Sequence, residues 1–96
     1  LYGRCADVEA VGALCQQYGA LLIEDAAEAL GARWQGRMAG TFGSAGIYSF
    51  NGNKIVTTGG GGALLTADPA LAARVRYLAT QARQPTPHYE HTELGY

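Results

Sequence analysis

Apolar residues recur at helical spacing near the start of the chain. Asp7 comes just before this pattern and suits the N-cap of a helix, because its side chain can accept hydrogen bonds from the first turn. Gly19 follows the last apolar position and is a typical helix stop. The apolar positions are Val8, Val11, Cys15 and Tyr18. The pattern therefore predicts one helix between Asp7 and Gly19.

Short apolar runs later in the chain predict strands. The runs cover residues 20–23, 47–50 and 63–66. A continuous apolar run directly after a helix is typical of a strand that is buried on both faces of a parallel sheet. Glu24 and Asp25 end the first run, and ligands bind at the carboxyl ends of strands in open α/β sheets. Asp25 therefore lies where a site is expected, and residues 26–30 predict a short helical turn after it.

The remaining segments complete an α/β order. Residues 32–38 alternate around a Gln-Gly pair, which predicts a small hairpin. Asp68 and Pro69 are a strong helix start, with the aspartate as cap and the proline at the first helical position. The apolar face of this second helix consists of Leu71, Val75 and Leu78. Residues 84–96 carry two prolines and many polar side chains, and they predict a loop.

Composition narrows the class of protein. The 96 residues suffice for one small domain, and 48% hydrophobic residues with 16% charged residues are typical of a chain that buries a core. A net charge of −1 without a basic stripe argues against a nucleic-acid partner, and no apolar run is long enough to cross a membrane. Cys5 and Cys15 are expected to be reduced thiols in a cytoplasmic protein. A start at Leu1 and a stop at Tyr96 suggest a piece of a longer protein.

The glycine run and the two histidines could in principle bind a ligand, but the surrounding sequence gives little support for either site. Gly59 to Gly62 could cradle a phosphate, but neither of the common nucleotide-binding glycine motifs is present. A tight, strained connection beside a site is the better interpretation of this run. His88 and His91 could bind a metal, but they lie in a loop without a further ligand set at metal spacing. Histidines that face solvent or a subunit interface are the better interpretation.

Lys54 is the only lysine in the chain, and it follows the predicted strand at 47–50. A lone lysine and a carboxylate at a neighbouring strand end, Asp25, suit pyridoxal phosphate. This cofactor needs an amine for its aldehyde, an acid against its ring nitrogen and hydroxyls for its phosphate. Ser49, five residues before Lys54, is a plausible phosphate ligand. The alternative is that Asp25 caps the following turn and Lys54 is solvated, and the pattern leaves both interpretations open.

Four segments resemble the DegT/DnrJ/EryC1/StrS family of pyridoxal-phosphate-dependent sugar aminotransferases. They are residues 23–32 (IEDAAEALGA), 49–54 (SFNGNK), 58–62 (TGGGG) and 88–96 (HYEHTELGY). The resemblance covers essentially the whole chain. It implies an α/β fold that is a fragment of the large domain of an aspartate-aminotransferase-type (fold type I) enzyme, with a mostly parallel sheet and flanking helices. Residues 1–96 would be part of that cofactor-binding domain, and the rest of it and a small C-terminal domain would lie outside this chain.

The resemblance also implies roles for individual residues. Lys54 would be the catalytic Schiff-base lysine, and Asp25 would pair with the pyridinium nitrogen. Ala27 would pack near the ring, Glu28 would stand where many members carry a glutamine near the ring hydroxyl, and Ser49 would bind the phosphate. The three residues before Lys54 replace a more usual His-Pro-Thr at the same spacing.

The implied reaction is transfer of an amino group from glutamate to a nucleotide-linked keto sugar, for amino-sugar and cell-surface polysaccharide biosynthesis. Related proteins with histidine in place of Lys54 dehydrate the sugar, so the lysine favours transamination. The family builds its site across a homodimer, and the loop ending at Tyr96 reaches toward the partner's site. We therefore expect the 96 residues alone to lack a complete site. The competing hypotheses are a non-catalytic regulatory relative that keeps the cofactor, and a structural module in which Asp25 and Lys54 have no chemical role.

Overall fold

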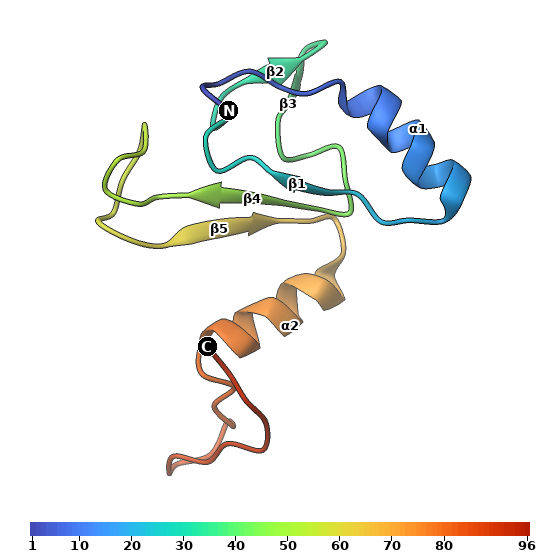
Figure 1. The fold of residues 1–96 in the computed structure, drawn as a ribbon. Helices are drawn as coiled ribbons and strands as arrows, with labels where there is room; N and C mark the ends of the chain where they lie inside the picture. The colour runs from blue at the N-terminus through green and yellow to red at the C-terminus, as the bar shows by residue number, and fades with distance from the viewer.

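Two helices and five strands make up the computed structural model, which describes residues 1–96 (Figure 1). In chain order they are α1 (Val8–Tyr18), β1 (Ile23–Asp25), β2 (Arg33–Trp34), β3 (Arg37–Met38), β4 (Ala45–Ser49), β5 (Gly62–Leu65) and α2 (Pro69–Ala79). The predicted order of helix, strand, turn, strand, strand and helix is confirmed. Neither helix is long and apolar enough to span a bilayer.

Both helices begin at their predicted caps, and α1 ends at its predicted stop. The Asp7 side chain accepts a hydrogen bond of 3.0 Å from the backbone N–H of Ala10. Gly19 adopts the left-handed conformation, with φ 64°, and its N–H bonds to carbonyls of the last turn of α1. The Asp68 side chain accepts bonds from two N–H groups in the first turn of α2, and Pro69 is its first residue. Each such cap contributes about 1 kcal/mol to helix stability.

The sheet has three strands in the order β1-β4-β5. Strands β1 and β4 are parallel, with Asp25 opposite Ile47, whereas β4 and β5 are antiparallel, with Ser49 opposite Gly62. A separate antiparallel hairpin of β2 and β3 forms where residues 32–38 predict one. Because β1 and β4 run in the same direction, their carboxyl ends lie at one edge of the sheet (Figure 1).

The first strand differs from its prediction in position and in burial. It covers Ile23–Asp25 rather than residues 20–23. Leu21 and Ile23 are 78% and 61% exposed, so the prediction of burial on both faces is wrong for the described chain. The physical reason is that α1 makes at most slight contact with β1 and so leaves these side chains uncovered. The apolar run predicts which side chains favour burial, but no other part of the 96-residue chain covers Leu21 and Ile23.

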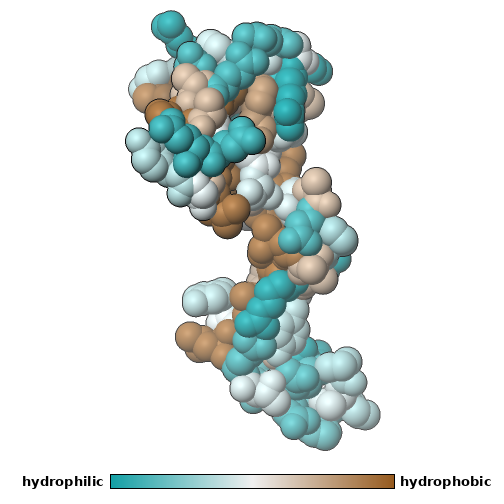
Figure 2. All heavy atoms as spheres, turned by 90° about the vertical axis from the view of Figure 1, so that its right-hand side faces the viewer, coloured by the Kyte–Doolittle hydropathy of each residue, from teal (hydrophilic) through white to brown (hydrophobic).

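The core is small and lies between β4, the turn after β1 and the hairpin. Four residues form it: Ala26, Ala29, Ala39 and Tyr48. Only nine of the 96 residues are buried, which is fewer than the composition suggests. Figure 2 shows hydrophobic side chains at the surface around the narrow middle of the molecule. The apolar content is therefore present but largely uncovered, with neither helix burying a residue completely.

Residues 84–96 form the predicted loop, but the loop is attached to the end of α2. The backbone of Tyr96 exchanges hydrogen bonds with Leu78 and Gln81. Arg74 of α2 donates two hydrogen bonds to the carboxylate of Glu93. This contact raises the pKa of Arg74 and lowers the pKa of Glu93, in each case chiefly through the hydrogen bond between the two side chains.

Acidification should weaken the attachment of this loop to α2. Glu93 has a folded-state pKa below its ordinary value of 4.5, so its contact stabilises the docked loop above that value and is lost as the pH falls through the lowered one. The pair is exposed, so we expect a small effect that salt weakens. Amide exchange at Tyr96 should be faster in acid than the intrinsic pH dependence predicts. Glu93→Gln should remove this excess, and an equal excess in that variant would contradict the assignment.

A β-carbon at position 46 should destabilise the fold strongly. It would lie 2.0 Å from the carbonyl oxygen of Gly40, so β4 and the preceding loop would have to separate. We expect Gly46→Ala to cost about 2–3 kcal/mol of unfolding free energy, measured by chemical denaturation. Gly12→Ala is the control, since nothing lies within 4 Å of its added carbon. Equal denaturation midpoints for Gly46→Ala and the unsubstituted protein would contradict this prediction, because they would show that the loop moves aside without loss of unfolding free energy.

Candidate functional site

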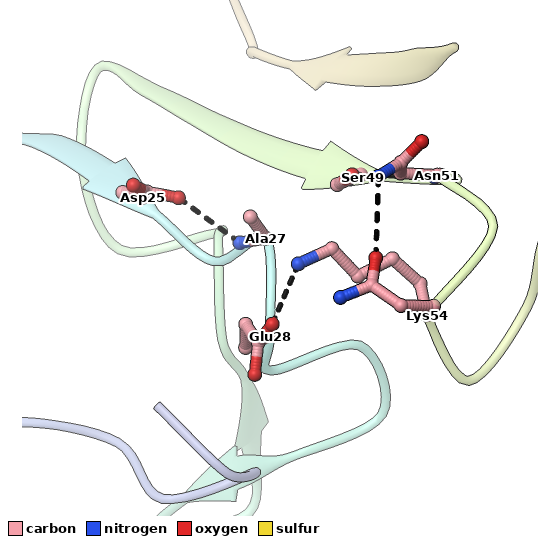
Figure 3. A network of polar contacts seen from close by, with 7 residues as sticks. Asp25, Ala27, Glu28, Ser49, Asn51 and Lys54 are labelled. Atoms are coloured by element: carbon pink, nitrogen blue, oxygen red, sulfur yellow. Dashed lines mark hydrogen bonds and ion pairs between the residues drawn. The ribbon is translucent and has the colours of Figure 1, made fainter. Parts of the chain in front are cut away.

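A cavity of about 210 Å³ lies at the edge of the sheet where β1 and β4 both end. We call it the site pocket. It is lined by Tyr2, Gly3, Ala27, Glu28, Leu30, Ser49, Asn53, Lys54, Ile55 and Val56. Four of the five predicted site residues are among them, and Figure 3 shows them converging from the turn after β1, the end of β4 and the loop that follows.

Lys54 lies in the loop between β4 and β5 and turns back into the site pocket. A turn holds it in place, because its backbone N–H donates to the carbonyl of Asn51 at 3.0 Å. Its Nζ donates to Oε1 of Glu28 at 2.6 Å, and the two side chains are 17% and 34% exposed. The hypothesis of a solvated lysine is therefore wrong for this structure. The only lysine of the chain is an amine held at the sheet edge by a carboxylate (Figure 3).

Asp25 is the predicted site residue that does not line this pocket. It ends β1 and is exposed, and its Oδ1 accepts a hydrogen bond of 3.1 Å from the N–H of Ala27. The carboxylate thus caps the turn that carries Ala27 and Glu28, as one sequence hypothesis expects. Its second oxygen accepts no hydrogen bond from the protein. Capping and ligand binding are therefore compatible in this residue, because one oxygen serves the turn and the other remains available.

Ser49 is the last residue of β4 and contributes a hydroxyl to the site pocket. Its Oγ accepts a hydrogen bond of 3.3 Å from the N–H of Asn51. The parallel register places Asp25 opposite Ile47, two residues before Ser49. The hydroxyl and the Asp25 carboxylate consequently project from neighbouring strand ends.

The glycine run returns the chain from the Lys54 loop to the sheet. Gly59 and Gly61 have φ of 81° and 103°, a conformation that favours glycine. A β-carbon at Gly62 would lie 2.6 Å from the carbonyl oxygen of Tyr48 on the neighbouring strand. None of these glycines lines the site pocket. The run is therefore a glycine-dependent connection from the Lys54 loop to β5.

The two loop histidines make local contacts. His88 lies 3.4 Å from the carboxylate of Glu90, and Nδ1 of His91 lies 2.8 Å from the carbonyl oxygen of Gln81. Both histidines are exposed. No cluster of three or more potential metal ligands occurs among the 96 residues. Cys5 and Cys15 are free thiols, as expected.

Sequence reasoning missed Glu24, which is the only buried charged residue of the chain. Its carboxylate accepts backbone hydrogen bonds from the loop that precedes β4. Strand alternation offered a signal, because the side chains of Glu24 and Asp25 must point to opposite faces of β1. Glu24 adjoins Asp25 and lies on the buried face of β1, so it is a candidate for a residue that positions the site.

The donor set of this edge fits pyridoxal phosphate. A half-buried primary amine, a hydroxyl and a carboxylate with an available oxygen meet the needs of the aldehyde, the phosphate and the ring nitrogen. They come from the carboxyl ends of two parallel strands and the loop beyond, where ligands of α/β sheets bind.

Comparison with known proteins identifies relatives over the whole chain. The sequence model of the DegT/DnrJ/EryC1/StrS aminotransferase family matches residues 1–96. The Bacillus subtilis protein named "Putative pyridoxal phosphate-dependent aminotransferase EpsN" is 52% identical over 96 residues, which are 100% of this chain and 25% of that protein. GDP-perosamine synthase of Caulobacter vibrioides is 41% identical over 96 residues, which are 26% of its length.

A solved structure gives the same result for the fold. Helicobacter pylori PseC, an aminotransferase involved in the biosynthesis of pseudoaminic acid, superposes with a TM-score of 0.89 at 28% identity. The match covers 99% of this chain and 26% of PseC. The predicted fold class, a fragment of a fold-type I aminotransferase, is confirmed, with one parallel and one antiparallel strand pair. The chain spans about a quarter of the length of these relatives.

Proposed function

This chain belongs to the DegT/DnrJ/EryC1/StrS aminotransferase family, whose members use pyridoxal phosphate, and we propose that the whole protein transfers an amino group from glutamate to a nucleotide-linked keto sugar. The observation that carries this proposal is the Lys54 amine, held 2.6 Å from Glu28 in the site pocket. An amine in that place is what a lysine-dependent transaminase requires. A histidine there would favour dehydration instead.

The cofactor supplies an aldehyde that bonds an amine and a ring that accepts electrons from the carbon next to it. Lys54 would hold the aldehyde through Nζ, and Ser49 would donate its hydroxyl to the phosphate. Asp25 would accept a hydrogen bond from the ring nitrogen with the oxygen that Ala27 does not use. Ala27 would pack near the ring. The carboxylate of Glu28 would lie beside the ring hydroxyl, at the position from which it contacts Lys54.

Lys54 would have a second role, in proton transfer. Its free Nζ would take a proton from the α-carbon of glutamate and deliver it to the adjacent cofactor carbon, acting first as base and then as acid. Glu28 would keep the amine pointed into the site pocket during this transfer, because it accepts a hydrogen bond from Nζ. The second half of the reaction would use the same groups in reverse order, with the keto sugar as acceptor.

The substrate class rests on relatives rather than on residues of this chain. GDP-perosamine synthase, 41% identical, is named for a nucleotide-linked amino sugar. PseC is described as an aminotransferase involved in the biosynthesis of pseudoaminic acid. We propose amino-sugar synthesis on this basis, and the further assignment to cell-surface polysaccharides and the cytoplasm follows from the family resemblance. Glutamate as donor follows from the family resemblance.

Residues 1–96 are proposed to be part of the cofactor-binding large domain. The chain spans about a quarter of its relatives, and its uncovered faces at Leu21 and Ile23 suit burial by further elements of such a domain. The whole protein would be a homodimer in which the loop ending at Tyr96 lies near the partner's site. The 96 residues alone would then be inactive, because the family resemblance implies that an aromatic residue stacked on the cofactor ring and further phosphate ligands lie outside them.

The test is an assay of the whole protein with pyridoxal phosphate, glutamate and a panel of GDP- and dTDP-linked keto sugars. We expect 2-oxoglutarate and an amino sugar to form in equal amounts, with glutamine as the comparison donor. A protein that gains the visible absorbance of lysine-bound cofactor but forms no 2-oxoglutarate would favour the regulatory alternative. Absence of both signals would contradict the proposal.

A further inference from the structure

The carboxylate of Glu24 is buried inside the protein without a cationic partner. Glu24 is 9% exposed, and none of the ion pairs of the chain includes it. Removing a charged group from water is costly unless hydrogen bonds replace the water. The groups that donate hydrogen bonds to the Glu24 carboxylate are therefore held in place by it.

Backbone N–H groups of a single loop supply them. Gly40 donates to Oε2 at 2.7 Å. Phe42 and Gly43 donate to Oε1 at 2.5 and 2.7 Å. Both oxygens of one side chain thus hold the loop from residue 40 to residue 43, which leads directly into β4. Hydrogen bonds from N–H groups to an ionised acceptor are shorter and stronger than neutral ones, so this is a firm attachment.

The loop is attached to its surroundings at further points. The Tyr48 hydroxyl, on β4, donates to the carbonyl of Ala39 at 2.6 Å. The N–H of Ser44 donates to the carbonyl of Leu22 at 2.9 Å. A β-carbon at Gly43 would lie 2.3 Å from that same carbonyl oxygen, so only glycine permits this approach. The buried contact of Glu24 is therefore the centre of a connection between β1, the loop and β4.

We propose that Glu24 is a positioning residue that fixes Asp25 and Ser49 relative to each other, and so sets the geometry of the site from the opposite face of β1. Glu24 and Asp25 are neighbours in one strand, so a rotation of one displaces the other. Tyr48 and Ser49 are neighbours in the other strand, and the same connection includes Tyr48. This inference rests on the proposed function, because it concerns the groups assigned to the cofactor.

Glu24→Gln tests the proposal with little change of shape. An amide has one accepting oxygen, so its NH₂ group would face at least one N–H of the loop, and a donor would face a donor. We expect the dissociation constant for pyridoxal phosphate to rise about tenfold in the whole protein, because Asp25 and Ser49 would no longer be held in the geometry that binds the cofactor. At saturating cofactor, we expect the visible absorbance maximum of the lysine-bound form to shift, because the partner of the ring nitrogen has moved.

A second destabilised variant distinguishes a positioning role of Glu24 from a contribution to stability alone. Asp68→Ala removes the cap of α2 and does not touch the site pocket. It should lower the melting temperature while cofactor affinity and absorbance stay unchanged. If Glu24→Gln behaves in the same way, with wild-type affinity and spectrum, the proposal is overturned.

Tyr48→Phe decides the matter if Glu24→Gln does not fold. It removes only the hydroxyl that bonds to Ala39, and it should weaken cofactor binding about threefold. Unchanged affinity in this variant would also overturn the proposal. The proposed function is tested separately in the unsubstituted whole protein, and it fails there if no 2-oxoglutarate forms from glutamate.

Discussion

Replacing Lys54 by alanine should lower the turnover of the whole protein by at least about 10³-fold, the range for loss of a general acid–base group. The loss combines two roles, since Nζ would both hold the aldehyde and move the proton. The visible absorbance of lysine-bound cofactor should disappear at the same time. The measurement is the rate of 2-oxoglutarate formation from glutamate, with an absorbance spectrum of each preparation.

Lys54→Arg is the matched control for this result. A guanidinium keeps the positive charge and can still pair with Glu28, which Nζ contacts at 2.6 Å. It cannot bond the aldehyde or act as a base at neutral pH. We expect Lys54→Arg to be as inactive as Lys54→Ala while retaining more of the wild-type melting temperature. Retained absorbance in either variant would assign the covalent bond to a different lysine of the whole protein.

Replacing Asp25 by asparagine should lower turnover by about 10²-fold, comparable to loss of one electrostatic contact in an active site. Asparagine keeps an oxygen that can accept the N–H of Ala27, so the turn after β1 should persist. It removes the negative charge that would keep the ring nitrogen protonated. The expected result is a lower kcat with a folded protein, measured by steady-state kinetics and thermal unfolding.

Asp7→Asn is the control for Asp25→Asn. Asp7 caps α1 through a bond to Ala10 and does not line the site pocket, and asparagine caps helices equally well. Its kinetics should match those of the unsubstituted protein. Full activity in Asp25→Asn would mean that the carboxylate serves only as the cap of its turn.

Local chemistry predicted the helix ends and the place of the candidate amine. Asp7, Gly19 and Asp68 act within a few residues of their own positions, so sequence alone locates them. Ser49 and Lys54 lie close together because a strand end and a short turn separate them. In each case the residues in contact are only a few positions apart in the sequence.

The features that sequence missed depend on contacts between distant segments. Glu24 bonds to N–H groups 16 to 19 residues away, and no pattern of apolar residues encodes that partner. Leu21 and Ile23 were predicted to be buried, but burial depends on what covers them, and no described element does. The ion pair of Lys54 and Glu28 spans 26 residues and likewise required the structure.

Backbone hydrogen bonds close the base of the loop that carries Lys54. Phe50 bonds to Gly61 at 2.9 Å and to Thr58 at 3.0 Å, so the amine is anchored by the neck of the loop. Because both bonds use backbone atoms only, other side chains at positions 51–53 would leave this neck closed. Searches for such enzymes by the motif preceding the lysine would overlook sequences of this kind. Counting residues from the end of the strand would find them.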